Sequence, residues 1–212
     1  MKKKFTIATA CLMGALALAS SAQANTITYQ ITSDHATGGL GTPPFGTVTL
    51  TEVGANLNVN VSLNAGYLFV LTGAADFQDF KFNATGVAVS DITITQNAPA
   101  PAGILTASTG TYNGDGTGSF GFGITGSTQQ NGTAGAFGTP IIFSIANATI
   151  ADLTQPNNLG ILFVADLYST STGNTGPADV TPPTTVPDGG ATVAMLGAAL
   201  VGLGGFRKMI KK

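Results

Sequence analysis

The amino-acid sequence predicts an all-β protein, an antiparallel β-sandwich, with a jelly roll among the topologies that would fit. Apolar and polar residues alternate with a period of two through most of the middle of the chain. That region shows no convincing 3.6-residue period of an amphipathic helix. Alternation of this kind is typical of strands with one face toward the core and one toward water. Turns rich in Gly, Asn and Pro separate the alternating runs at the short intervals of a sandwich.

The expected strands follow one another from residue 27 to residue 168. The first three alternate Ile, Tyr, Val or Leu with Thr, Gln, Asn or Ser. Residues 141–145 and 160–168 are apolar on both faces, which indicates central strands. The other apolar residues assigned to strands are Ile27, Tyr29, Ile31, Val48, Leu50, Leu57, Val59, Val61, Leu63, the run 67–71, Phe77, Phe80, Phe82, Ile92, Ile94, Phe120, Phe122 and Ile124.

Residues 1–24 have the three parts of a secretory signal peptide. Three lysines follow the initiating Met, an apolar stretch runs to Leu18, and the small residues Ala22 and Ala24 occupy the positions that a signal peptidase reads. We therefore expect cleavage after Ala24, so that the mature protein begins at Asn25.

Cysteine usage limits the chemistry of the mature chain. The one cysteine, Cys11, lies within the signal peptide. Only six residues separate it from Lys4, a context that disfavours a lipoprotein attachment site. Removal of the signal peptide excludes disulfides, thiolate zinc sites and a cysteine nucleophile. We therefore expect packing alone to stabilise the mature protein.

The mature part of the chain is strongly acidic. Residues 25–187 hold nine acidic side chains and one basic side chain, Lys81. Nucleic-acid binding needs a basic surface that neutralises phosphates, so the charge balance excludes a nucleic-acid partner. The charges are also sparse, and solubility depends on Thr, Ser, Asn and Gln. This composition is typical of an extracellular β-protein.

Residues 169–185 are rich in Pro, Gly, Ser and Thr and hold few apolar side chains, which predicts a linker. Residues 25–168 are then one β-sandwich ectodomain, within the usual size of a single domain.

The C-terminal segment 186–212 combines a turn motif, an apolar run and a basic end. The apolar run, residues 191–206, would span roughly 24 Å as a helix, which is short of the roughly 30 Å hydrocarbon core of a bilayer. The basic residues in 207–212 would place the C-terminus in the cytoplasm and the ectodomain outside. The turn motif consists of Val186, Pro187, Asp188, Gly189 and Gly190.

This tail resembles the VPDSG-CTERM branch of the PEP-CTERM sorting signals, with Gly189 in place of the usual serine. The resemblance implies processing near Pro187 and Asp188 by an exosortase, an integral membrane cysteine transpeptidase or protease, after transient residence in the bacterial membrane. It also implies a mature form at the cell surface or outside the cell. The body of the chain is similar to the β-rich ectodomains that often precede such tails. The alternative interpretation is a C-terminal anchor that is never cut.

No catalytic set is apparent in the sequence, and we expect a protein that is not an enzyme and has no cofactor. The sole histidine, His35, follows Asp34, but strand neighbours point to opposite faces and no serine has a nucleophile-elbow setting. We expect His35 to be a loop residue without a special role. Asp76 and Asp79 are close enough to act as a glycosidase pair, although the preferred interpretation is that both are solvated at the rim of a strand.

Asn113 and Asp115 are candidate ligands of a calcium ion, because oxygen ligands alternate with glycines in this segment. The terminal acidic ligand of a calcium loop is missing, and a hairpin between residues 111–112 and 119–120 explains the same residues without metal. The favoured function is therefore a non-catalytic surface or extracellular-matrix protein associated with exopolysaccharide. The alternative is a carbohydrate-binding module, with or without calcium, that would use its tyrosines: Tyr29, Tyr67, Tyr112 and Tyr168.

Overall fold

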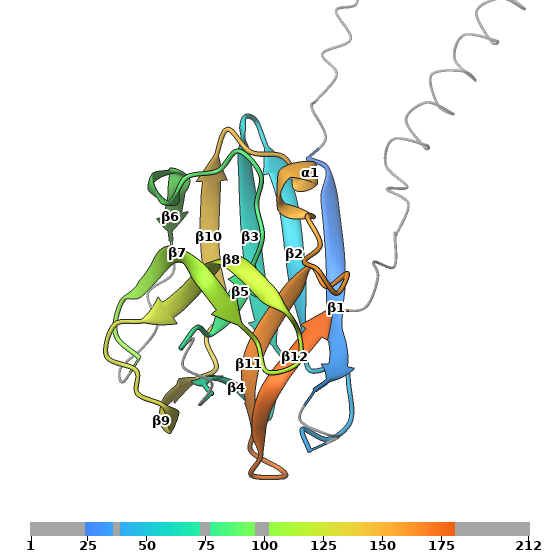
Figure 1. Cartoon of the computed structure of the whole chain (residues 1–212), viewed down its shortest axis with the longest axis vertical. Helices are drawn as coiled ribbons and strands as arrows, with labels where there is room; N and C mark the ends of the chain where they lie inside the picture. Colours follow the sequence, from blue (N-terminus) through green and yellow to red (C-terminus); the bar gives the residue numbers. More distant parts are fainter. Residues whose placement is uncertain (1–23, 36–38, 73–76, 96–101, 181–212) are drawn as a thin grey trace, which may run out of the picture.

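The computed structural model describes residues 24–35, 39–72, 77–95 and 102–180 (Figure 1). Strands dominate these residues, and every pair of strands is antiparallel. A 3-10 turn and one short α-helix join them. The elements are β1 (Thr26–Asp34), β2 (Gly46–Val53), β3 (Asn56–Leu63), β4 (Tyr67–Leu71), β5 (Phe80–Phe82), η1 (Val89–Asp91), β6 (Ile92–Ile94), β7 (Leu105–Asn113), β8 (Ser119–Gly126), β9 (Gly132–Phe137), β10 (Ile141–Ala146), α1 (Ile150–Leu153), β11 (Phe163–Ser169) and β12 (Thr175–Val180).

The strands form one hydrogen-bonded sheet that folds over itself into two layers. The sheet order is β6-β10-β3-β2-β1-β12-β11-β5-β8-β7. Outside this order, β4 pairs with β11, and β9 pairs with β4. In Figure 1 the strands β7, β8, β11 and β12 lie in front of β10, β3 and β2. The expected all-β antiparallel fold is confirmed, and its two layers are continuous through β1.

Strand β1 belongs to both layers because it changes partner along its length. Its first half pairs with β2, from Thr26 opposite Thr51 to Ile31 opposite Gly46. Its second half pairs with β12, and the register shifts between Ile31 and Ser33. A bulge bends and twists a strand locally, which allows β1 to pass from one layer to the other.

Aromatic side chains join the two layers in the core. Phe143 on β10 packs against Phe82 on β5, with ring centroids 5.5 Å apart. Tyr29 on β1 meets Phe163 on β11 edge to face at 5.4 Å. Helix α1 covers one end of the core with two buried residues, Ile150 and Leu153. Because aromatic rings bury large areas, these contacts hold the layers together without any disulfide.

The period-two pattern identified the core-facing residues well. Strands β1, β2, β3, β4, β6 and β8 lie where the alternation predicts them, and Phe80 and Phe82 face inward from β5. Phe77, which was assigned to the same strand, lies before β5 and is exposed. Strand β11 is buried on both faces, as expected for a central strand. Strand β10 differs from the prediction, because Ile142 and Ser144 are half-buried on the outer face.

The linker prediction is wrong for residues 175–180, which form β12. This strand lies between β1 and β11, and Ala178 is fully buried. Pairing runs from Tyr168 opposite Thr175 to Val164 opposite Asp179. The folded body therefore extends beyond residue 168, at least to Val180. Residues 181–185, the rest of the expected linker, lie outside the described residues.

Candidate functional site

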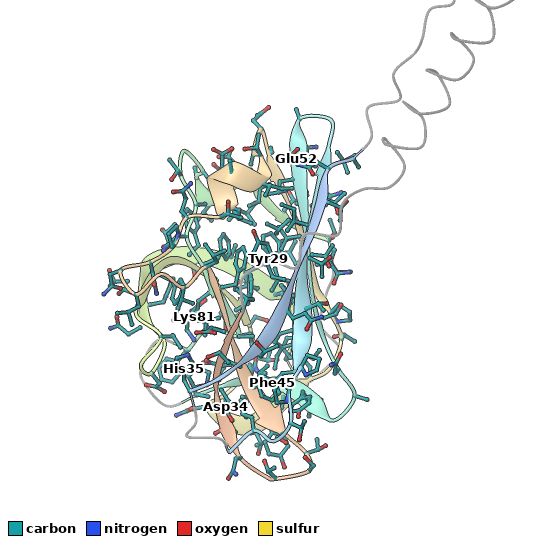
Figure 2. The ribbon with its side chains drawn as sticks, turned by 90° about the vertical axis from the view of Figure 1, so that its right-hand side faces the viewer. Tyr29, Asp34, His35, Phe45, Glu52 and Lys81 are labelled. Carbon is teal, nitrogen blue, oxygen red and sulfur yellow. The ribbon has the colours of Figure 1, made fainter. Side chains whose placement is uncertain are left out.

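A cluster of buried and half-buried polar side chains lies in the layer that contains β5 and β11. We call it the Lys81 cluster and define it by Thr72, Asp79, Lys81, Gln129 and Asp166. Lys81, Asp79 and Asp166 are all fully buried. In Figure 2, Lys81 lies in the same half of the molecule as His35 and Asp34, and Glu52 lies at the opposite end. Lys81, the one lysine or arginine in residues 25–187, is thus internal.

Strand register brings the three charged residues together. Val164 lies opposite Lys81, and Ala165 lies opposite Phe80. Continuing this antiparallel register places Asp166 opposite Asp79, and the Asp166 N–H donates to the Asp79 carbonyl at 3.0 Å. Side chains two residues apart on a strand share a face. Asp79 and Lys81 are therefore neighbours on one face, which is opposite to that of the core residues Phe80 and Phe82.

Lys81 forms an ion pair within this cluster. Its Nζ lies 2.9 Å from Asp166 Oδ2, and both side chains are almost completely excluded from solvent. The Thr72 hydroxyl donates to the same oxygen at 2.6 Å. One oxygen of Asp166, Oδ2, thus contacts both the Thr72 hydroxyl and the Lys81 ammonium group.

Asp79 has a separate set of partners. Gln129 Nε2 donates to its Oδ1 at 2.8 Å, and the Gly126 N–H donates to its Oδ2 at 3.2 Å. Burial raises the pKa of Asp79 to about 7, and the nearby Asp166 carboxylate adds to this increase. Its hydrogen bonds and Lys81 act in the opposite direction but do not outweigh burial. Asp79 is therefore substantially protonated near neutral pH.

These contacts correct the interpretation of Asp79 as a solvated residue at the rim of a strand. The carboxylate is enclosed rather than exposed. Asp76, the second carboxylate of the glycosidase pair considered above, lies outside the described residues. The acidic residue that the fold places beside Asp79 is Asp166. Sequence reasoning missed this cluster, because an isolated Lys81 and a distant Asp166 carry no local pattern. The available signal was the occurrence of a single basic residue between two phenylalanines.

His35 contacts Asp179 rather than its sequence neighbour Asp34. Its Nε2 lies 2.7 Å from Asp179 Oδ2 and 3.4 Å from the Ser33 hydroxyl. A serine triad uses the two ring nitrogens separately, one for the acid and one for the serine. Here the same nitrogen faces both groups, so the arrangement does not form a triad. His35 follows the end of β1, as expected for a loop residue, and its contact with Asp179 ties the end of β1 to β12.

The hairpin predicted around Asn113 and Asp115 is confirmed by the pairing of β7 with β8. The Ser119 hydroxyl donates to Asn113 Oδ1 at 2.8 Å, so this calcium candidate already has a protein partner. Asp115 is exposed, at the mouth of an open hollow of about 580 Å³ that Asn158 and Leu159 also line. The described residues contain no group of three His, Cys, Asp or Glu side chains with metal-binding geometry.

Three of the four tyrosines are held by contacts within the protein. Tyr29 is buried in the core. The Tyr67 hydroxyl donates to the Thr42 carbonyl, and its ring packs against Phe45. The Tyr112 hydroxyl donates to Ser108. The first of these residues cannot reach a glycan, and the next two are engaged by the protein itself.

The outer face of the β1-β2-β3-β10-β6 layer carries rows of hydroxyl and amide side chains, in which Ile142 is the one apolar member. We call it the Thr/Asn face. One row crosses all five strands through directly paired residues, and a second row lies beside it. None of the side chains in these rows is charged, although the body is strongly acidic. The rows consist of Thr26, Thr51, Asn58, Ser144 and Thr93, and of Thr28, Thr49, Asn60 and Ile142.

The two ends of the described body lie close to the expected processing sites. Ala24 is exposed and lies two residues before the start of β1, and the Asn25 carbonyl accepts from the Glu52 N–H at 2.9 Å. Ala22 and the sorting motif Val186 to Gly190 lie outside the described residues. Within the described residues, no helix has the length and apolar character needed to cross a bilayer.

Comparison with known proteins identifies the C-terminal segment. A family model described as the VPDSG-CTERM motif matches residues 185–209. No curated protein sequence and no solved structure matches the chain. The matched residues contain the turn motif, the apolar run and the beginning of the basic end. The chain therefore carries the VPDSG-CTERM motif, a C-terminal sorting signal of exported proteins.

Proposed function

We propose that this protein is a non-catalytic component of the cell surface or extracellular matrix, which an exosortase processes at its C-terminal tail and which associates with exopolysaccharide. The observation that carries the proposal is the match of residues 185–209 to the VPDSG-CTERM motif. The apolar run of that tail is short for a permanent span, which supports removal after export. The acidic body and the nine-to-one ratio of acidic to basic residues in 25–187 also suit an extracellular location.

The mass of the protein recovered from the cell surface tests the processing step. We expect a species that begins at Asn25 and ends near Pro187. A Pro187→Ala variant should keep the basic residues of 207–212 and stay in the membrane fraction, because the motif that the enzyme reads is altered. Pro182→Ala changes the same residue type outside the motif and should be processed normally. Wild-type protein that retains Lys211 and Lys212 would show that the tail is an ordinary anchor.

The Thr/Asn face supports association with a polysaccharide. Its hydroxyl and amide groups can donate to and accept from sugar hydroxyls. The rows hold no carboxylate that would repel an acidic polymer. A hollow of about 430 Å³ lies on this face, lined in part by Thr49, Asn58 and Asn60. At the alternative site, the β7–β8 hairpin, fewer hydroxyl and amide side chains stand in rows across paired strands. The exposed carboxylate of Asp115 would also repel an acidic polymer.

Binding to purified exopolysaccharide tests this surface. Asn58→Asp introduces a charge in the middle of the face with little change in shape, and we expect it to weaken binding by roughly tenfold, a free-energy loss of about 1.4 kcal/mol. Asn131→Asp makes the same chemical change at an exposed position near β9 and should bind as wild type. Equal binding by both variants and wild type would contradict the assignment. Calcium-dependent binding that is lost in Tyr112→Ala would instead favour the hairpin.

A further inference from the structure

We propose that Lys81 and Asp166 form an intramolecular isopeptide bond, an amide between the lysine Nζ and the aspartate Cγ, which covalently joins β5 to β11. The two side chains are already in contact, with Nζ 2.9 Å from Oδ2. They come from adjacent antiparallel strands whose register is held by the pairs on either side of them. The inference concerns the body alone and goes beyond the proposed function.

The reaction is a condensation that needs no oxidant, metal or cofactor. A proton passes from the ammonium to the Asp166 carboxylate, which leaves a neutral amine beside a neutral carboxyl group. The Nζ lone pair attacks Cγ, and the new C–N bond forms as one C–O bond breaks. Two of the three ammonium protons leave with that oxygen as one water molecule, and the third stays on the amide nitrogen. The ion pair is thereby converted into a neutral amide.

Burial favours this conversion. Lys81 and Asp166 each have a relative exposure of 0%. Removing two ions from water is costly, and their mutual attraction offsets that cost only in part. The amide product carries no charge, so burial favours it relative to the ion pair. Fixed contact between the reacting groups also replaces an encounter between free molecules, which raises the effective concentration.

Asp79 supplies the third group that the reaction uses. It lies two residues before Lys81 on the same face and is paired with Asp166 across the strands. We assign it the role of positioning and proton exchange, in which its carboxyl gives a proton to the leaving oxygen and accepts one from the attacking nitrogen. The raised pKa of Asp79 supports this role, because a carboxyl that is protonated near neutral pH can do both. Thr72 holds the Asp166 oxygen in place through its hydroxyl.

The placement of basic residues gives a direct test. Between residues 5 and 206 the chain holds a single lysine and no arginine, and that lysine is Lys81. Trypsin acting on the denatured protein should therefore cut the body once, after Lys81, when its amine is free. When Nζ is part of an amide the site is blocked. We expect denatured wild-type protein recovered from the exporting cell to resist trypsin between its ends. Its intact mass should be lower than the sequence mass by one water molecule.

Variants separate the cross-link from an ordinary ion pair. Lys81→Arg keeps the charge and the trypsin site but cannot condense, so the denatured chain should be cut into two pieces. Asp79→Asn is close in shape and should leave most of the chain uncondensed, with full sequence mass and a cut at residue 81, while its native circular dichroism is retained. Wild-type protein that trypsin divides completely at Lys81, or that resists trypsin without loss of water, would overturn the proposal. The cut at Lys81 does not depend on the tail, and the loss of one water is judged against the sequence mass of the species recovered, whichever ends it has. Failure here therefore leaves the sorting proposal standing.

Discussion

Asp79 shows how much a residue's surroundings change its chemistry. Its carboxyl is buried against Lys81, Asp166, Gln129 and the backbone of Gly126. Burial is the largest cause of its raised pKa, which the structure places near 7. In the unfolded chain the same carboxyl has its ordinary value near 3.8. The folded protein therefore holds a proton on Asp79 over a pH range in which the unfolded chain releases it.

This difference predicts a pH dependence of stability. The contribution of Asp79 is fully present below about pH 4 and is lost progressively as the pH rises to about 7, a change of about 4 kcal/mol at most. Asp79→Asn removes the titrating group. As the pH rises from about 4 to about 7, the free energy of unfolding of the wild type should therefore fall relative to that of the variant. Urea unfolding at a series of pH values measures it. A difference that stays constant from pH 4 to pH 8 would show that Asp79 is ionised in the folded protein.

Among the strands, β12 is the element whose local sequence least favours the strand conformation that it adopts. Gly176 and Pro177 are poor residues for a central strand, and the surrounding Ser, Thr and Gly residues indicate a linker. The strand nevertheless pairs on both sides, with β1 and with β11. Its side chains also contribute contacts, since Asp179 meets His35 at 2.7 Å. Tertiary pairing therefore overrides local propensity here.

A pair of aspartate substitutions distinguishes a strand from a linker. Ala178→Asp would bury an unpaired carboxylate between β1 and β11 and should destabilise the protein by more than about 3 kcal/mol. Thr175→Asp makes a similar change at an exposed position of the same strand and should cost less than about 1 kcal/mol. Chemical denaturation of both variants measures the difference. Equal, small effects would mean that residues 175–180 do not belong to the fold.

For the molecule as a whole, the proposed cross-link would compensate for the absence of disulfides. A link between Lys81 and Asp166 closes a loop of roughly 85 residues in the unfolded chain. By the chain-entropy model used for disulfides, such a loop stabilises the folded state by about 4 to 5 kcal/mol. Residues 25–180 hold no cysteine with which to obtain this effect in another way.

The stability of the whole molecule should therefore fall when the link cannot form. We expect Lys81→Arg to lower the melting temperature by about 10 °C or more. In an Asp79→Asn background, where the link is already largely absent, the same substitution should cost much less. Differential scanning calorimetry of the two single variants and the double variant measures this coupling. Strictly additive losses would argue that Lys81 acts only through its ion pair.

The sequence by itself determined the β class, the core-facing residues of most strands and the sorting motif. Alternation along one strand is a local property, and the motif is a linear pattern that needs no partner segment. Strand β7 was predicted only at its hairpin end, and β9 was not predicted. Both strands are short of large apolar residues, since their segments read LTASTGTYN and GTAGAF.

Only the tertiary structure decided which distant residues meet. Asp166 reaches Lys81, and Asp179 reaches His35, through strand pairing between segments far apart in the chain. No local pattern records such a register, because it depends on how every intervening strand packs. For the same reason only the fold could show that Asp79 is enclosed and that residues 175–180 lie between two strands.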